Sequence, residues 1–276
     1  MRKKNRDKPS LRIAAIQLDS GPDVNKNLKK VERMVNVLDP MTDVVVLPEV
    51  FNFRRNAPDI RMYSEHLNGQ SAQALMAYAK KMNVTIIGGS IMETSNTGKA
   101  YNTSMVVNPA GEIIAAYRKM HLFDVELDGQ TIKESNESIP GHQPEMSNID
   151  GWNMGLSICY DIRFPELFRW YMNHGADVLV IPSSFTHETG KKHWHILCQA
   201  RAIENQCYVI AANQCGVGAS GAQTYGHSLI IDPSGGILAE ADENTEGIIY
   251  GTLHKTCLED LRKKFPVKSH QRNILR

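Results

Sequence analysis

Apolar residues recur along the chain with two different spacings, and their order predicts an α/β protein. Continuous apolar runs such as VVVLP, at residues 44–48, are typical of strands covered on both faces. Apolar residues three or four positions apart predict amphipathic helices. The pattern predicts helices at residues 24–38, 71–82, 163–174 and 192–206, and strands at residues 11–18, 44–49, 84–92, 101–108, 112–119, 155–159, 177–183, 207–214, 226–233, 236–241 and 247–253.

The second half of the chain repeats the order of elements in the first half. MVVNPAGEIIAAY (residues 105–117) resembles LIIDPSGGILAEA (residues 229–241), and each segment is typical of a hairpin. Two similar halves must bury the apolar faces of two sheets, which predicts a four-layer α-β-β-α sandwich of two packed mixed sheets with helices outside. Because no Pro/Gly/Ser-rich linker separates the halves, we expect one domain over residues 10–276, after a disordered basic start at residues 1–9.

The polar segment at residues 120–150 is too long for a passive connection, and we expect it to be irregular and to cover a functional site. The charges nearly balance, with 31 Lys and Arg against 30 Asp and Glu, so nothing indicates binding to nucleic acid or to an anionic membrane. No signal-peptide core or membrane-spanning run is present, which predicts a cytoplasmic protein. The five cysteines form no CxxC pair and indicate reduced thiols.

Three polar residues follow apolar strands: Glu49, Lys119 and Cys159. Catalytic groups gather at the carboxyl ends of strands in α/β folds, so the three could converge. A cysteine before a helix start faces the positive end of the helix, which favours a thiolate, and a base and a cation beside it would complete a nucleophilic site. The alternatives are a packed thiol and two surface charges, and the spacing leaves both possibilities open.

Three segments resemble, in order, the motifs of the nitrilase superfamily of carbon–nitrogen hydrolases. They are LPEVF, YRKMHLF and GLSICYDIRFPEL, and the similarity continues through HWHILCQARAIENQCYVIAANQ and YGHSLIIDP. The resemblance therefore covers almost the whole chain. It implies the four-layer sandwich, a Glu–Lys–Cys triad and a homodimer formed through the helices near Cys159 and at residues 192–206. It implies no metal and no organic cofactor.

The resemblance also implies a role for each matching residue. Cys159 is expected to be the nucleophile, Glu49 the general base, and Lys119 with the backbone N–H of Tyr160 the oxyanion stabilisers. Glu134 matches a second glutamate that orients the substrate. The positions that contact the 2-oxo-acid part of the substrate correspond to Arg163, Phe185 and Thr189, although a helix-start salt bridge, a core residue and a helix cap are equally open for these three.

The implied reaction is hydrolysis of a small 2-oxo-acid amide through a thioester. The similarity is greatest to the branch that converts deaminated glutathione to 2-oxoglutarate and cysteinylglycine. The alternatives are an ω-amidase acting on 2-oxoglutaramate, another small-amide or N-carbamoyl hydrolase, and a non-catalytic binding protein on the same fold. The intact set of Glu49, Lys119 and Cys159 argues against the last alternative, because a binding protein does not need all three.

Histidines supply two further hypotheses. HETGKKHWH, at residues 187–195, does not fit a zinc motif, because His193 and His195 would diverge on a helix. His121 is interpreted as a residue that orders a loop and not as the base of a papain-like pair. Relatives often carry a glutamate where this chain has His195, which removes an acidic partner that we expect near the site.

Overall fold

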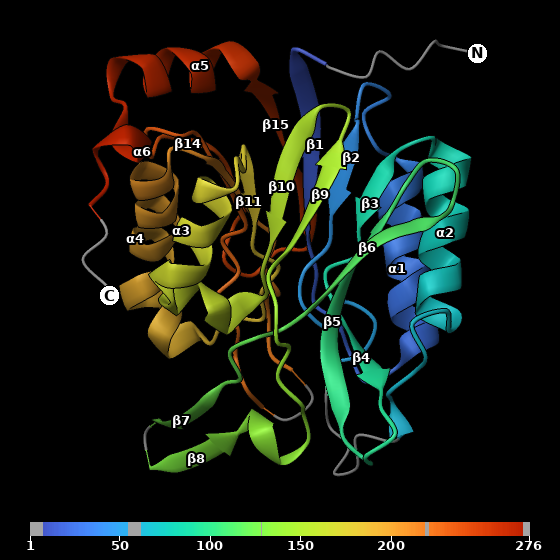
Figure 1. Cartoon of the computed structure of the whole chain (residues 1–276). Helices are drawn as coiled ribbons and strands as arrows, with labels where there is room; N and C mark the ends of the chain where they lie inside the picture. The colour runs from blue at the N-terminus through green and yellow to red at the C-terminus, as the bar shows by residue number, and fades with distance from the viewer. Residues whose placement is uncertain (1–7, 55–61, 128, 219–220, 273–276) are drawn as a thin grey trace.

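The computed structural model describes residues 8–54, 62–127, 129–218 and 221–272 (Figure 1). Most of the expected disordered start, residues 1–7, lies outside the described residues. Lys8 and Pro9 are held to the fold, because the N–H of Lys8 donates to the carbonyl of Asp150 and the carbonyl of Pro9 accepts from Lys255. Among the described helices, none is both long and apolar enough to cross a membrane.

Two large sheets form the centre of the molecule. In the seven-stranded sheet the order is β15-β1-β2-β3-β5-β4, and β6 pairs with β5. Its strands are β1 (Ser10–Gln17), β2 (Val44–Val46), β3 (Thr85–Ile87), β4 (Ile91–Thr94), β5 (Ala100–Val107), β6 (Ile113–Arg118) and β15 (Gly247–His254). The six-stranded sheet has the order β14-β13-β12-β11-β10-β9, with β9 (Glu145–Ile149), β10 (Trp152–Leu156), β11 (Val178–Val180), β12 (Tyr208–Ala211), β13 (Leu229–Ile231) and β14 (Ile237–Glu240).

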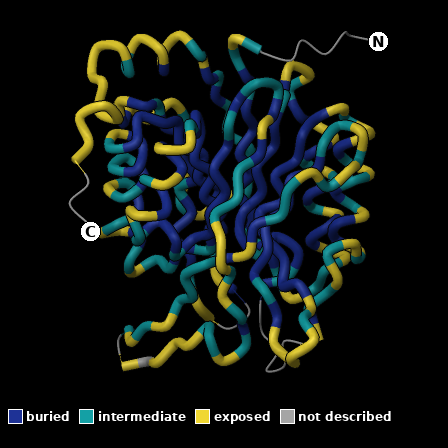
Figure 2. The backbone as a smooth tube through the Cα atoms, in the orientation of Figure 1, coloured by how far each residue is buried: buried dark blue, intermediate teal, exposed yellow. Residues whose placement is uncertain are grey.

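Helices cover the outer face of each sheet, so the predicted α-β-β-α sandwich is confirmed (Figure 1). The helices α1 (Val24–Asn36) and α2 (Gln70–Met82) pack on the first sheet, and α3 (Pro165–Asn173) and α4 (His187–Asn205) pack on the second. Strand β1 shows why two faces must be covered: Ala14 and Ile16 belong to the core under α1, whereas Ile13 and Ala15 belong to the core between the sheets. Figure 2 shows buried residues in the inner layers and exposed ones at the rim.

The internal repeat is visible in the geometry of its two hairpins. The β5–β6 ladder shifts register between Val106 and Val107, and the β13–β14 ladder shifts between Ile230 and Ile231, which are the aligned positions of the repeat. The turns also match, since the side chains of Asn108 and Asp232 each accept two backbone N–H groups within the turn. The sequence repeat therefore encodes the same bulged hairpin twice.

The predicted helices at residues 163–174 and 192–206 need correction at their starts. Residues Cys159–Arg163 form a 3-10 turn, η3, and α3 begins only at Pro165. Helix α4 begins at His187, five residues before its predicted start, because its first turns are polar and give no apolar period. Two further helices, α5 (Lys255–Lys264) and α6 (Val267–His270), were not predicted, since their residues are mostly exposed and α5 buries only Leu258.

The strands predicted at residues 44–49, 177–183, 207–214 and 226–233 are shorter in the structure: β2, β11, β12 and β13. Three further differences concern the surroundings of the site. The run at residues 84–92 is broken into β3 and β4 at Gly88 and Gly89, and Gly89 adopts a positive φ of 46° that glycine accommodates. The strand predicted at residues 155–159 is β10 and ends at Leu156, so Cys159 lies beyond the ladder. The segment at residues 120–150 is not irregular: it holds the hairpin of β7 (Asp124–Leu127) and β8 (Gln130–Lys133), a 3-10 turn, η2 (Glu134–Asn136), and the edge strand β9.

Candidate active site

The carboxyl ends of strands from both halves meet at one cavity of about 540 Å³. Glu49 follows β2, Lys119 follows β6, and Cys159 opens the turn after β10. The hairpin β7–β8 and η2 form one wall, so the expectation that this segment covers a site is met. All eight residues singled out from the sequence line this cavity: Glu49, Lys119, Glu134, Cys159, Tyr160, Arg163, Phe185 and Thr189.

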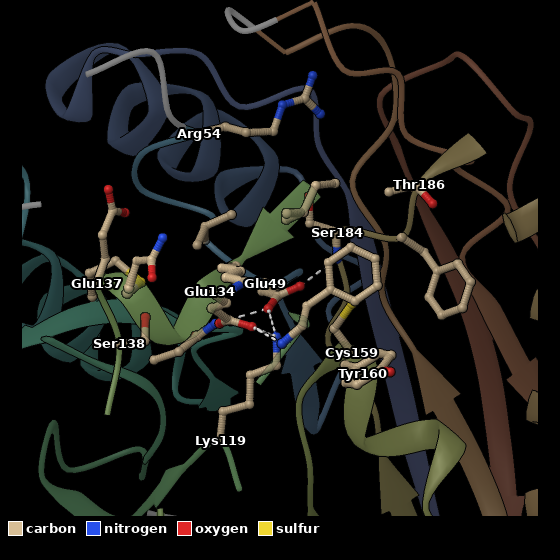
Figure 3. A pocket seen from close by; sticks show the side chains of 18 of the residues that line it. Glu49, Arg54, Lys119, Glu134, Glu137, Ser138, Cys159, Tyr160, Ser184 and Thr186 are labelled. Atoms are coloured by element: carbon tan, nitrogen blue, oxygen red, sulfur yellow. Dashed lines mark hydrogen bonds and ion pairs between the residues drawn. The ribbon is translucent and has the colours of Figure 1, made fainter. Parts of the chain in front are cut away.

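A buried lysine between two glutamates forms the floor of the cavity (Figure 3). Lys119 Nζ donates to Glu49 Oε1 at 3.0 Å and to Glu134 Oε2 at 2.9 Å, and only 2% of its side chain is exposed. Burial alone would lower the pKa of Lys119, but the charges of Glu134 and Glu49 outweigh it and raise the pKa well above its ordinary value. The lysine is therefore held as a cation.

Two groups that the sequence analysis missed hold the carboxylate of Glu49 in place. Asn102 Nδ2 donates to Glu49 Oε1 at 2.9 Å and to Glu134 Oε1 at 3.3 Å, and the backbone N–H of Ser184 donates to Glu49 Oε2 at 2.8 Å. Asn102 lies inside β5, where a buried amide has no sequence signal beyond its polarity. Ser184 contributes a main-chain group, which no side-chain pattern can indicate.

Cys159 lies at the start of η3 in a left-handed backbone conformation, with a φ of 47°. Few non-glycine residues adopt this region, and surrounding contacts must hold them there. Its N–H donates to the carbonyl of Pro182 at 2.9 Å, beyond the end of β11. The side chain is 9% exposed and faces the cavity beside Glu49 and Lys119 (Figure 3).

The surroundings of Cys159 favour a thiol, one of the two possibilities that the sequence left open, over a thiolate. Burial first, and then the negative charge of Glu49, raise the pKa of Cys159 well above its ordinary value, although Lys119 and the N–H of Ser184 act in the opposite direction. The five-residue 3-10 turn that Cys159 opens separates the cysteine from α3, which begins at Pro165 and not at residue 163 as predicted. The resting group is a thiol, and an adjacent base is required to activate it.

Asp161 fixes the turn that carries Cys159. Its carboxylate is fully buried and accepts the N–H of Ile158 at 2.8 Å, the hydroxyl of Tyr117 at 2.8 Å and the N–H of His121 at 3.0 Å. His121 Nδ1 is also 2.7 Å from Asp161 Oδ1, which confirms His121 as a residue that orders this loop. Because Tyr117 and His121 flank Lys119, one carboxylate aligns the cysteine turn with the lysine.

The remaining predicted residues surround the opening of the cavity. Among the described residues, no acceptor takes the N–H of Tyr160, as expected for the first turn of a helix. Phe185 is 3% exposed and belongs both to the core and to the cavity wall. Thr189 lies in the first turn of α4, and its Oγ1 is 2.7 Å from Oγ1 of Thr186, which is the actual N-cap residue.

Arg163 has no carboxylate partner within the described part of the chain, so a helix-start salt bridge does not explain it. Both terminal nitrogens of Arg163 lie 3.3 Å from His193 Nδ1, and the guanidinium lies over the rings of Phe185 and Tyr160. Burial first, and then the charge of Arg163, lower the pKa of His193, so the imidazole accepts as a neutral ring.

His195 does not line the cavity, although position 195 was expected to lie near the site. Its Nε2 is 2.9 Å from Glu240 Oε1, and neither residue lines the cavity, so the exchange of glutamate for histidine does not alter the surroundings of Cys159 directly. His187 pairs with Glu243 and His193 with Arg163, which confirms that the three histidines of HETGKKHWH diverge. Within the described residues, side chains able to hold a metal ion gather only at His195, His227 and Glu240, outside the cavity.

An α-β-β-α sandwich with a cysteine, a lysine and two glutamates in one cavity suits a hydrolase that acts on carbon–nitrogen bonds. Residues 12–263 match the model of the family described as carbon-nitrogen hydrolase, and the chain belongs to this family. It is a hydrolase of the nitrilase superfamily.

Relatives of known name cover the chain almost completely. The deaminated glutathione amidase of Synechocystis sp. is 40% identical over 96% of this chain and 98% of its own length. The omega-amidase of Saccharomyces cerevisiae is 38% identical over 95% and 93%. Among solved structures, Saccharomyces cerevisiae Nit3, a member of branch 10 of the nitrilase superfamily, matches with a TM-score of 0.86 and 35% identity over 98% of both chains.

Proposed function

We propose that this hydrolase cleaves the amide bond of a small 2-oxo acid through a thioester on Cys159, with deaminated glutathione as the preferred substrate. The observation that carries the proposal is the Cys159 thiol placed beside the Glu49–Lys119–Glu134 network in one cavity. Two similar relatives, a deaminated glutathione amidase and an omega-amidase, support an amide of this class.

The first half-reaction begins from the resting thiol. Glu49 accepts the proton from Sγ as the sulfur attacks the amide carbon, since its carboxylate accepts from Lys119 and hydrogen-bonds with the thiol. The oxyanion that forms is stabilised by the cationic Lys119 and by the free N–H of Tyr160. Glu49 then returns its proton to the amine nitrogen, the carbon–nitrogen bond breaks, and an acyl thioester remains on Cys159.

The second half-reaction uses the same groups in reverse. Glu49 takes a proton from a water molecule, and the hydroxide attacks the thioester carbon. The same oxyanion partners stabilise the second intermediate, and its collapse releases the carboxylic acid and restores the thiol. Glu134 contributes by accepting a second hydrogen bond from Lys119, beside the carboxylate of Glu49 (Figure 3). No step calls for a metal or an organic cofactor.

Arg163 is the proposed partner for a substrate carboxylate. It lines the cavity, and its charge is not balanced by a carboxylate among the described residues. A guanidinium binds a carboxylate through two parallel hydrogen bonds, which suits the free acid group of a 2-oxo-dicarboxylic monoamide. Phe185 and Thr189 lie beside it on the cavity wall and would contact the same part of the substrate.

The volume of the cavity favours the larger of the two candidate substrates. A cavity of about 540 Å³ lies within the range for drug-sized ligands and leaves room for a dipeptide leaving group. In deaminated glutathione the leaving amine is cysteinylglycine, whereas in 2-oxoglutaramate it is ammonia. The open alternative is therefore an ω-amidase on the same residues, and an N-carbamoyl hydrolase is a weaker one.

We also propose that two copies of the chain associate through the α3–α4 face. Large apolar side chains are exposed there and on the neighbouring β14, which is unusual unless another surface covers them. The exposed set is Trp170, Ile196, Ile203, Ile237 and Leu238. Sedimentation velocity of the purified chain should show a dimer, and a monomer at every concentration would contradict this.

A cytoplasmic location stays a prediction from the sequence.

The test compares release of 2-oxoglutarate from deaminated glutathione and from 2-oxoglutaramate by the wild type, Cys159→Ala and Arg163→Gln. We expect faster release from deaminated glutathione, complete loss in Cys159→Ala and a raised KM in Arg163→Gln. Preference for 2-oxoglutaramate would retain the mechanism and assign the ω-amidase activity. Unchanged turnover by Cys159→Ala would refute the thioester mechanism, and binding without turnover by the wild type would favour a binding protein.

A further inference from the structure

Two imidazoles and a carboxylate meet on the second sheet, away from the cavity. We propose that His195, His227 and Glu240 form a binding site for a divalent transition-metal ion, with Zn²⁺ as the ion that suits it best. The three come from different parts of the fold: the third turn of α4, the loop before β13 and the last position of β14. None of them lines the amidase cavity, so the site is independent of the proposed reaction.

The three ligand atoms lie close enough together to surround a single ion. His195 Nε2 and His227 Nδ1 lie 2.9 Å and 2.7 Å from Glu240 Oε1, and one ligand atom from each residue lies within 4.8 Å of the others. Zinc binds nitrogen and oxygen ligands at about 2.0–2.2 Å, which places neighbouring tetrahedral ligands about 3.4 Å apart. Both carboxylate–imidazole distances are shorter than this spacing, so the carboxylate and the rings must move apart to admit the ion.

The surrounding structure holds the two rings in position. The carbonyl of His227 accepts from Trp194 Nε1 at 2.7 Å, and its backbone has a φ of 48°, which few residues other than glycine adopt. The ring of Tyr225 packs against both imidazoles, with its centroid 4.5 Å from that of His227 and 5.9 Å from that of His195. Ligands fixed in this way lose little conformational freedom when an ion binds.

The donor set selects the class of ion. Imidazole nitrogens favour Zn²⁺ and its transition-metal neighbours over Mg²⁺ or Ca²⁺, which prefer oxygen ligands. With both rings neutral, one carboxylate leaves a net charge of +1, and a water molecule can take the fourth position. The side chains of His195, His227 and Glu240 are 28%, 22% and 35% exposed, so an ion can enter from solvent. The bound ion would tie α4, which carries Thr189 of the cavity wall, to β14.

The test is a calorimetric titration of the full chain with Zn²⁺ in a Cys159→Ala, Cys257→Ser background, which removes the catalytic thiol and the exposed thiol. We expect one site per chain, with affinity reduced at least about 100-fold by Glu240→Gln or His195→Gln, since even indirect partners of metal ligands contribute 10- to 100-fold. His227→Asn is a second ligand variant, because asparagine tolerates the left-handed backbone. His187→Gln is the matched control. His187 lies on α4 like His195 and pairs with one carboxylate, that of Glu243, but among the described residues it belongs to no group of three metal-binding side chains.

Co²⁺ gives a second readout that does not depend on activity. Binding at this site should produce visible d–d bands without a sulfur-to-metal charge-transfer band, and Zn²⁺ should raise the Tm of the background protein but not of Glu240→Gln. Equal Zn²⁺ affinity in the background and the ligand variants would overturn the proposal, as would a sulfur charge-transfer band. A Zn²⁺ affinity lost equally in His187→Gln would show general imidazole binding and would also overturn it. Circular dichroism of each metal-free variant checks that it is folded.

Discussion

Asp161 illustrates how a residue that does not face the substrate can control the site. It contacts Ile158, Tyr117 and His121, and through them sets the position of Cys159 relative to Lys119. Asp161→Asn keeps the shape of the side chain but replaces one carboxylate oxygen with an NH2 group, which faces N–H and O–H donors. We expect kcat to fall on the order of 100-fold, as for a misplacement of about 1 Å, with KM nearly unchanged. Steady-state kinetics on the preferred amide measures this split.

A matched variant separates positioning from general destabilisation. Tyr117→Phe removes one donor to Asp161 and leaves the other contacts intact, so a smaller loss of kcat is expected. Urea unfolding should show a loss of about 1.5–3 kcal/mol for Asp161→Asn, the usual contribution of a hydrogen bond to a charged group. If Asp161→Asn raised KM and left kcat unchanged, the residue would act on substrate binding and not on the cysteine turn.

Among individual residues, the sequence reveals the charged and nucleophilic ones but not the groups that orient them. Glu49, Lys119 and Cys159 could be found because each breaks the pattern just after an apolar strand. Asn102 could not, because a polar residue inside a strand usually faces solvent and only the folded structure buries it against Glu49. The sequence left the protonation state of Cys159 open for the same reason: it depends on burial, which the sequence does not give.

Among the elements, α4 gives the clearest test of packing. Gly190 lies inside this helix against the ring of Tyr225, and an added Cβ would meet ring atoms at 2.3 Å. In an exposed helix, Gly→Ala stabilises by about 1 kcal/mol, but here overpacking dominates, and we expect Gly190→Ala to destabilise by about 1–3 kcal/mol. Thermal or urea unfolding measures the difference.

Gly21→Ala is the control for this prediction. Apart from its chain neighbours, no atom of the described residues lies within 4 Å of an added Cβ at Gly21, so this variant should be neutral or slightly stabilising. A Gly190→Ala variant as stable as the wild type would show that Tyr225 moves without cost.

Element boundaries were hardest to predict where a segment lacks an apolar period. The first turns of α4 contain few apolar residues and more than half of α5 is exposed, so little in the sequence distinguishes them from loops. Strand β9 was missed because it is a short edge strand with the sequence EMSNI, which is stabilised by its ladder to β10 and not by its own propensity. Helices α1 and α2, with clear apolar stripes, were predicted within two residues.

For the whole molecule, buried thiols predict a stability that depends on pH. Burial raises the pKa of Cys207 and of Cys215 to about 12, and raises that of Cys198 further, from an ordinary value of 9.0. Below pH 9 these thiols are protonated in both states and do not affect the balance. Between pH 9 and about 12 the unfolded chain loses their protons while the folded chain keeps them, so the free energy of unfolding falls as pH rises.

Urea unfolding under reducing conditions at pH 7 and pH 10 checks this expectation. The midpoint should be lower at pH 10, and Cys257→Ser should not change the fall, because Cys257 is exposed. Equal midpoints at both pH values would contradict the prediction.

The architecture of the whole chain was the most predictable level. Repetition of one bulged hairpin, at residues 105–117 and 229–241, is legible in the sequence because turn residues and apolar strands recur together. Side-chain contacts between elements far apart in the sequence could not be predicted in this way. His195 meets Glu240 across 45 positions of the chain, and such a pairing depends on how α4 lies over the second sheet.

The resting thiol at Cys159 has a consequence for the activity of the enzyme under oxidative stress. Peroxides and alkylating agents react with thiolates, and the susceptibility of a cysteine follows its thiolate character and its exposure. The nucleophile is buried and protonated at rest, and it loses its proton to Glu49 only during attack on an amide. It therefore offers little thiolate to a diffusing oxidant. Such a cysteine should resist conversion to sulfenic acid, so the enzyme should continue to work in cells whose exposed, low-pKa thiols are already oxidised.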